Sequence, residues 1–379
     1  MQSILVISFS ELDSDSRVRR QLRLFKDAYQ VTVVGLTDPG IHGVKFVRAV
    51  ESRRNMGWHL RTACLLGLRR FERYYWAIPE VRSCLERLDG RSFNYYIAND
   101  PLALPLGLRL AQGRPLLYDA HEYAPRKQED HLGWRLIMKP FNVHLMSQYL
   151  PKVSAAITVS EGLSIEYKKN FGVEMGVIMN ASSYQELEAS PVEEKRIRLV
   201  HQGHAFRRRK LEEMIDMMGM LDARFTLDLI LRVSDDRYLR ELKERAGNDP
   251  RIIFREALRA DEIVAAINEY DIGIYIMPPS NFNMENALPN KLFQFIQARL
   301  GVAIGPTPEM AKLVKDYRCG VVARDFSAKS LAKELNSLGA EDVRRFKKQA
   351  SIAAGELNYE RESERLRAVF DSMVLKERD

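Results

Sequence analysis

Short apolar runs rich in β-branched residues alternate along the chain with segments of helical period. This alternation is typical of parallel sheets covered by helices on both faces, so it predicts an α/β protein. The runs form two similar series, which predicts two Rossmann-like domains. The predicted strands are Ile4–Phe9, Val31–Leu36, Tyr95–Ala98, Leu116–Tyr118, Ala156–Val159 and Val177–Met179 in the first series, and Arg198–His201, Thr226–Leu231, Ile252–Phe254, Ile272–Ile276, Val302–Ile304 and Gly320–Val322 in the second.

A polar stretch that contains Pro191 and no apolar run separates the two series. Because linkers are polar and exposed, we place a first domain at 1–181, a linker at 182–196 and a second domain at 197–357. A last helical segment, within 358–379, follows the final helix of the second domain.

The segment Asn286–Gln294 is a loop that turns into a helix, with Pro289, Asn290 and Lys291 in the first turn. Such a helix start offers unpaired backbone N–H groups and a cation to an anion. The next apolar run, 301–305, is typical of a short buried strand. The pattern therefore predicts a phosphate cradle at the carboxyl edge of a sheet.

Several segments resemble, in chain order, the landmarks of GT-B glycosyltransferases of family 4. The segments are Asp15–Val18, Tyr118–Glu122, Ala156–Glu161, Val177–Asn180, Gly203 with Arg209–Glu212, Asn286–Gln294 and Gly305–Glu309. The resemblance spans nearly the whole chain and implies a GT-B fold, in which two Rossmann-like domains turn their parallel sheets toward a central cleft. It also implies that 358–379 returns to the first domain.

In the second domain, the resemblance implies a site for a nucleoside diphosphate sugar. Gly203, Arg209 and Lys210 would approach the diphosphate from one side, and Asn290 and Lys291 from the other. An alternative is that the run Arg207–Lys210 is only a solvated loop.

Beyond the diphosphate, Gln294 would accept from the ribose hydroxyls through its carbonyl. Glu285 and Asn286 would touch the transferred sugar. The family usually has two glutamates where this chain has Asn286 and Gln294, and an arginine where it has His204. An amide lacks the charge of a carboxylate and makes a weaker hydrogen bond, so weaker ribose binding is expected.

In the first domain, His121 follows a predicted strand and would face the cleft. The resemblance implies that it contacts the transferred sugar or an acceptor hydroxyl, with Glu122 orienting it or binding the acceptor. Asp13 and Asp15 match a metal motif of the other glycosyltransferase fold, but a helix N-cap at Asp15 or Ser16 explains them better.

The function implied is a metal-independent, retaining glycosyltransferase with no cofactor beyond its donor. It would transfer a hexose or hexosamine from a UDP-sugar, or else a GDP-sugar, to a glycan, a lipid-linked acceptor or a small molecule. Two alternatives share the fold: a catalytically weakened binding or regulatory protein, and a nucleotide-sugar epimerase.

Charge adds one further expectation. The net charge is +7, and residues 1–180 hold 25 basic against 18 acidic residues, whereas 181–379 hold 33 of each. Within 45–91, 11 basic and 5 acidic residues are interleaved with Trp58, Phe71, Tyr74, Tyr75 and Trp76. This stretch is expected to meet an anionic membrane or acceptor, the alternative being a solvated helix face beside an aromatic core. No nucleic-acid motif accompanies the charge.

Composition favours the cytoplasm. The three cysteines, Cys64, Cys84 and Cys319, have no metal-ligand spacing and fit a reducing compartment. The first residues enter a predicted strand at once, without the pattern of an export signal.

Overall fold

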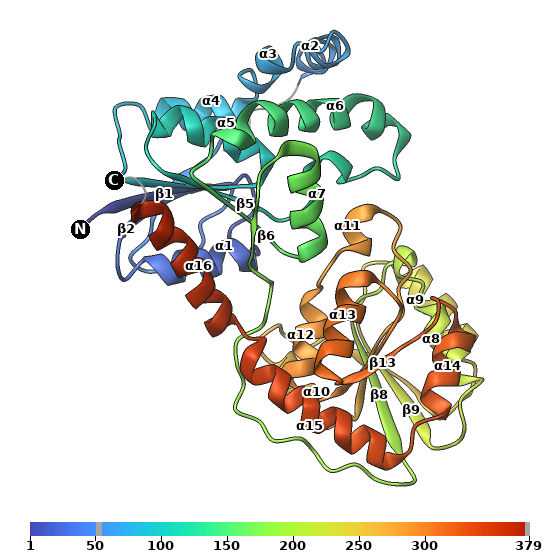
Figure 1. The fold of residues 1–379 in the computed structure, drawn as a ribbon. Coiled ribbons are helices and arrows are strands. Elements are labelled where there is room, and N and C mark those ends of the chain that lie inside the picture. The colour runs from blue at the N-terminus through green and yellow to red at the C-terminus, as the bar shows by residue number, and fades with distance from the viewer. Residues whose placement is uncertain (51–54, 376–379) are drawn as a thin grey trace. The chain divides into compact units, whose positions relative to one another are not determined.

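The computed structural model describes residues 1–50 and 55–375. Residues 51–54 of the basic stretch and 376–379 of the last segment therefore lie outside the described residues. The chain forms two compact units (Figure 1). Unit 1 holds 1–179, 281–284 and the segment from 363, and unit 2 holds 180–280 and 285–362.

Each unit is built on one parallel sheet, which confirms the predicted α/β class. The sheet of unit 1 has the order β3-β2-β1-β4-β5-β6-β7. Its strands are β1 (Ser3–Ile7), β2 (Gln30–Gly35), β3 (Lys45–Arg48), β4 (Tyr95–Asn99), β5 (Leu116–Ala120), β6 (Ala155–Thr158) and β7 (Gly176–Val177). The sheet of unit 2 has the order β10-β9-β8-β11-β12-β13. Its strands are β8 (Ile197–His204), β9 (Phe225–Arg232), β10 (Ile252–Glu256), β11 (Ile272–Tyr275), β12 (Gly301–Ile304) and β13 (Gly320–Val322).

Helices connect and cover these strands. Those of unit 1 are α1 (Ser16–Phe25), α2 (Met56–Gly67), α3 (Phe71–Tyr75), α4 (Pro79–Arg87), α5 (Asp100–Ala111), η1 (Ala124–Arg126), α6 (Leu132–Tyr149), η2 (Leu150–Lys152) and α7 (Glu161–Phe171). Those of unit 2 are η3 (Arg207–Arg209), α8 (Glu212–Met218), α9 (Asp236–Ala246), α10 (Ile263–Ile267), α12 (Asn290–Gln297), α13 (Pro308–Tyr317), α14 (Ala328–Asn336) and α15 (Ala340–Glu356). Two more, α11 (Phe282–Glu285) and α16 (Tyr359–Leu375), begin in one unit and end in the other.

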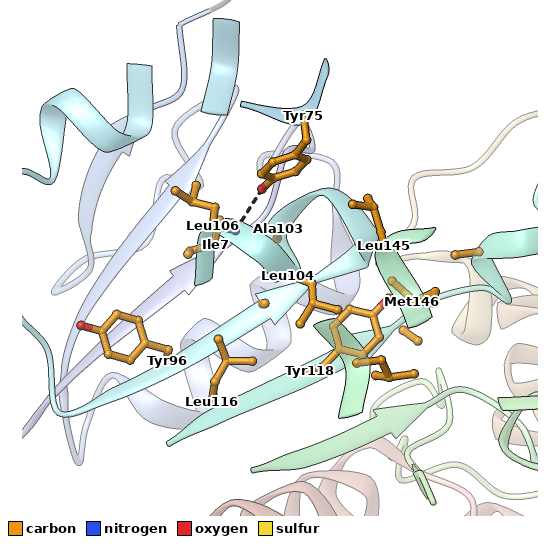
Figure 2. Packing of buried hydrophobic residues seen from close by; sticks show 14 of the residues in the cluster. Ile7, Tyr75, Tyr96, Ala103, Leu104, Leu106, Leu116, Tyr118, Leu145 and Met146 are labelled. Atoms are coloured by element: carbon orange, nitrogen blue, oxygen red, sulfur yellow. Dashed lines mark hydrogen bonds between the residues drawn. The ribbon is translucent and has the colours of Figure 1, made fainter. Parts of the chain in front are cut away.

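A buried tyrosine of unit 1 satisfies backbone groups of a helix that contains a proline. Pro105 lies inside α5 and disrupts its backbone hydrogen bonds. The hydroxyl group of Tyr75 binds the backbone at this point (Figure 2). The Tyr75 hydroxyl accepts from the Leu106 N–H at 3.0 Å and donates to the Leu102 carbonyl at 2.7 Å. Tyr75 is therefore a core residue that satisfies two backbone groups.

The last helix packs on the sheet of unit 1. Leu366, Phe370 and Met373 of α16 are buried in one cluster with residues of β1, β2 and α1. The ring of Phe370 lies 4.7 Å from that of Phe25. This apolar face explains why the segment from 363 belongs to unit 1.

Two local predictions are decided by the structure. The Asp15 carboxylate accepts from the Val18 N–H at 3.1 Å, which confirms it as the N-cap of α1. The expectation that the aromatic residues of 45–91 face a partner is wrong for Phe71 and Tyr75, which are buried, whereas Trp58, Tyr74 and Trp76 are half-buried.

Candidate functional site

The most unusual polar cluster of unit 2 lies at the carboxyl edge of its sheet. Lys291 is the second residue of α12, and its Nζ lies 3.4 Å from His201 Nε2 on β8. The same ammonium lies 4.9 Å from the ring centroid of Tyr275, the last residue of β11. A buried lysine is thus surrounded by an imidazole and a phenol ring.

The tautomer of His201 follows from its second contact. Its Nδ1 lies 2.9 Å from the Ile274 carbonyl, which can only accept, so Nδ1 carries the hydrogen. The lone pair of Nε2 therefore faces Lys291. Burial and the charge of Lys291 hold the pKa of His201 well below its usual value, so this imidazole is neutral and leaves the positive charge of Lys291 unbalanced.

Gly203 allows a second cation to approach. Its φ is +140°, and a Cβ added there would lie 2.9 Å from Arg209 Nη1 and 3.0 Å from Lys291 Nζ. A side chain at position 203 would therefore displace both cations. Arg209, at the end of η3, also donates from Nη1 to the His204 carbonyl at 3.2 Å.

These cations lack a counter-ion among the described residues, since no ion pair within 1–50 and 55–375 includes Lys291 or Arg209. Burial, and then the charge of Arg209, holds the pKa of Lys291 well below its usual value. Burial likewise lowers the pKa of Arg209. A desolvated charge without a partner destabilises the fold, and a bound anion would remove that penalty. The arrangement can therefore hold an anion.

A cavity of about 200 Å³ adjoins the cations. It shares Gly203 with them and is otherwise lined from β8, β9 and the loop after β10, by Gln202, His204, Ile230, Arg232, Ala257, Leu258, Ala260 and Ile263. The cavity lies beside Arg209 and Lys291, so it could hold a group that is attached to an anion bound by these two cations.

The other predicted site residues of unit 2 differ in burial and in their contacts. Gln294 lies one turn after Lys291, and its Oε1 accepts from Gln202 Nε2 at 2.5 Å. Lys210 and Asn290 are exposed, and Lys210 has a left-handed backbone, with φ +46°. Glu285 is exposed, whereas Asn286 is buried. The structure thus brings together Gly203, Arg209 and Lys291 out of the predicted set.

In unit 1, His121 lies among oxygen atoms at the carboxyl edge of the sheet. Its Nε2 is 3.1 Å from Asn99 Oδ1, and its Nδ1 is 3.7 Å from the carboxylate of Asp100. The Asp119 carboxylate lies 3.9 Å from Nε2. Glu122 instead pairs with Lys127 at 3.0 Å, so the neighbours that orient His121 are Asn99 and Asp100.

Two polar atoms at this sheet edge lack partners. Asn99 Nδ2 and Ser160 Oγ are buried and have no hydrogen-bond partner among the described residues, and both residues end or follow strands at the same sheet edge. Asp100 has φ +65°, a strained conformation for a residue other than glycine. Unsatisfied donors and local strain are features of a binding site, and hydroxyl groups of a sugar would satisfy them.

A buried ion pair fixes the base of this cluster. Arg17 binds Asp119 with two bonds, Nε to Oδ2 at 2.8 Å and Nη2 to Oδ1 at 2.7 Å. Its Nη1 also donates to the Ile178 carbonyl at 2.8 Å. The bidentate geometry holds the end of β5, and hence His121 two residues later, in one place.

Sequence reasoning missed His201 and Tyr275, because they lie within apolar strands and therefore resemble core positions. Asn99 and Asp100 carried a usable signal, since polar residues directly after a buried parallel strand mark the binding edge of such a sheet.

The described residues contain no cluster of three or more His, Cys, Asp or Glu side chains that could hold a metal ion. None of the helices in that part of the chain is long and apolar enough to cross a membrane.

The architecture matches solved glycosyltransferase structures over almost the whole chain. HepE from Anabaena, solved in complex with UDP, superposes with a TM-score of 0.72 at 15% identity, covering 98% of this chain and 100% of that one. The chain has the GT-B fold. Sucrose-phosphate synthase from Thermosynechococcus elongatus gives 0.72 at 12% identity, with 99% and 100% coverage. WaaG, a glycosyltransferase involved in lipopolysaccharide biosynthesis, gives 0.63 at 14%, with 96% and 98%.

Comparison by sequence gives no match. No protein-family profile matches the chain, and no curated protein does either. At identities this low the structural likeness establishes the fold, and the activity has to be argued from the site.

Proposed function

We propose that this GT-B protein is a glycosyltransferase that takes a hexose or hexosamine from a UDP-sugar. The proposal rests on Arg209 and Lys291, two cationic side chains that lie next to Gly203. Neither forms an ion pair with any of the described residues. Departure of a nucleoside diphosphate builds negative charge on its phosphates, and preorganised cations stabilise that charge. The UDP bound in the HepE structure supports this choice of ligand.

The adjoining cavity of about 200 Å³ offers room for a base beside the diphosphate. The UDP bound in the HepE structure makes uracil our choice over guanine. We therefore place the uracil there, the ribose near Gln294 and Gln202, and the diphosphate on Arg209 and Lys291.

Acceptor binding is proposed for the His121 cluster of unit 1. Asn99 Nδ2 and Ser160 Oγ would donate hydrogen bonds to oxygen atoms of the acceptor. The Asp100 carboxylate would accept a hydrogen bond from an acceptor hydroxyl group. The acceptor would be a glycan, a lipid-linked sugar or a small molecule.

In the proposed reaction the bond from the anomeric carbon to the diphosphate oxygen breaks, and a bond to the acceptor oxygen forms. The acceptor proton passes to the leaving diphosphate, and the anomeric configuration is retained. Arg209 and Lys291 supply the charge stabilisation, so we propose that no metal ion is required. Three free cysteines fit a reducing compartment, and we place the reaction in the cytoplasm.

Calorimetric titration of the full chain with UDP, GDP and UDP-glucose tests the proposal. UDP and UDP-glucose should bind, with GDP weaker. A ligand at about 100 times its dissociation constant should also raise the free energy of unfolding by about 2.7 kcal/mol. Folded protein that binds none of the three would refute the donor site.

A second candidate is a GT-B binding protein with weakened catalysis. Asn286 and Gln294 replace carboxylates, and Gln294 Oε1 already accepts from Gln202. Slow hydrolysis of UDP-glucose in the absence of an acceptor would favour the transferase. Tight binding without turnover would favour the binding protein, and release of an epimerised free sugar would identify an epimerase.

A further inference from the structure

Helices α2 and α6 of unit 1 expose large apolar side chains, although they contact each other and lie on one layer of the unit (Figure 1). On α2 and directly after it, Met56, Leu60 and Leu68 are 74%, 66% and 67% exposed. On α6 the exposed residues are Leu132, Leu136, Ile137 and Val143. We call these seven residues the α2/α6 face.

This exposure is unusual for a solvated helix. In α2 only Leu66 is fully buried, and the 12 residues include a single Lys or Arg, Arg61, and no acidic residue. A helix that is apolar on most sides is normally covered by protein or lipid. Contiguous exposed apolar surface marks an interaction site, whereas single exposed residues need no explanation.

The charge around this face is mainly positive. Residues 56–75 and 132–149 together contain six Lys or Arg residues and one acidic residue, Glu72. Glu72 is already engaged, because it pairs with His144 at 2.8 Å and accepts from the Tyr149 hydroxyl at 2.6 Å. The basic residues, among them Arg69, Arg70, Arg135 and Lys139, are exposed. An anionic partner is therefore indicated.

A cavity of about 450 Å³ borders α2 and adds to the positive charge. Arg61, Arg82 and Arg87 line it together with Trp58 and Tyr74, and Glu86 is its acidic member. No ion pair among the described residues includes any of the three arginines. A phosphate group could pair with these guanidinium groups.

We propose that the α2/α6 face docks on an anionic phospholipid bilayer, with the apolar side chains in the acyl boundary and the basic residues at the headgroups. A second copy of the chain fits less well, because a two-fold contact would bring two positive faces together. A bilayer supplies both an apolar layer and phosphate at the depth that long arginine side chains reach. The inference does not depend on the proposed transferase activity.

Co-sedimentation of the full chain with vesicles tests the proposal. The protein should pellet with phosphatidylcholine vesicles that contain phosphatidylglycerol, and far less with phosphatidylcholine alone. Binding should weaken with salt, because the Debye length falls from about 10 Å at 0.1 M to about 3 Å at 1 M. No pelleting, or equal pelleting with both vesicle types at low salt, would overturn the proposal.

A pair of matched variants locates the contact. Leu60→Gln/Leu136→Gln should bind vesicles at least tenfold more weakly, because each change removes an apolar anchor without altering charge. The control Ile165→Gln/Ile352→Gln removes two other exposed apolar side chains, on α7 and α15, and should bind like wild type. Equal binding by the first variant would overturn the assignment to this face.

A further variant measures how much the basic residues contribute to vesicle binding. Arg69→Gln/Arg70→Gln should weaken binding about fivefold per residue and flatten the salt dependence. An unchanged midpoint of thermal unfolding would show that all variants remain folded. A wild-type dimer in sedimentation equilibrium that Leu60→Gln/Leu136→Gln dissociates would overturn the bilayer in favour of a second copy.

Discussion

Unit 2 contains two buried lysines, Lys347 and Lys291, whose surroundings differ in charge compensation. Lys347 of α15 donates to Ser190 Oγ and to the Tyr270 carbonyl, each at 2.7 Å, and lies 3.4 Å from the Asp271 carboxylate. Burial lowers its pKa to about 8, and Asp271 counteracts that shift. Lys291 has a neutral imidazole at 3.4 Å, an aromatic ring and a second cation, Arg209, against the same glycine.

The difference separates a charge that the protein compensates from one that it does not. Lys347 is compensated within the protein, so its partners account for its burial. No described residue supplies an anion to Lys291, so burial penalises its charged form, and a bound anion would remove that penalty. A buried cation whose surroundings do not compensate it is therefore the stronger indicator of a binding site.

The largest effect should come from Lys291→Met. Loss of one preorganised contact to the leaving diphosphate should lower sugar transfer or UDP-glucose hydrolysis by about tenfold to a thousandfold. The free energy of unfolding should stay equal or increase, since an uncompensated charge is removed. Steady-state kinetics and urea denaturation measure both. An unchanged rate in folded protein would contradict the assigned role.

Gly203→Ala should displace Arg209 and Lys291 without changing their charge. The new Cβ would meet Arg209 Nη1 and Lys291 Nζ, so UDP affinity should fall about tenfold or more, a loss of about 1.4 kcal/mol. Gly247→Ala is the matched control, because Gly247 also has positive φ, +57°, but open space around its Cβ position. Both variants should lose some stability. Equal UDP affinity in the two would show that the cations are not held against Gly203.

Lys347→Met should reverse the pattern of Lys291→Met. Its removal leaves buried oxygen atoms without their donor, which should lower the free energy of unfolding by roughly 1–3 kcal/mol. UDP affinity should not change. Asp271 keeps Arg198 as a partner, which limits the loss. Weaker UDP binding with unchanged stability would invalidate the distinction between the two lysines.

The smallest effect is a proton taken up on donor binding. The pKa of Lys291 is low in the free protein, and a bound diphosphate must raise it, so a fraction of a proton should bind with UDP-glucose. Affinity should therefore decrease as pH rises through the pKa of free Lys291. Calorimetry in two buffers of different ionisation enthalpy measures the uptake. In Lys291→Met the uptake should disappear, and its persistence there would assign it to another group.

The strands show which part of the fold was predictable. Each of the twelve predicted strands overlaps an observed one, because a strand covered on both faces is apolar along most of its length. The prediction Val177–Met179 shares only Val177 with β7. The run Lys45–Arg48 was not predicted as a strand. It forms the edge strand β3, where half-buried and exposed positions leave a mixed pattern.

The predicted residues of the site divide in a similar way. Lys291 was identifiable because the start of a helix after a loop has its own sequence signature. The choice between Arg209 and Lys210 was not, because it depends on the backbone turn: Lys210 adopts φ +46° and is exposed, while Arg209 reaches Gly203.

By itself, the sequence determined the α/β class, the two series of strands, the N-cap at Asp15 and a cation at the start of α12, since these follow from hydrophobic period and local hydrogen bonding. Only the tertiary structure decided which charges lack partners, because compensation depends on residues far apart in the chain. His201 and Lys291 are 90 residues apart, and Arg17 and Asp119 are 102 apart. Local patterns contain no record of such distances, so packing alone gave Lys347 a carboxylate partner and left Lys291 without one.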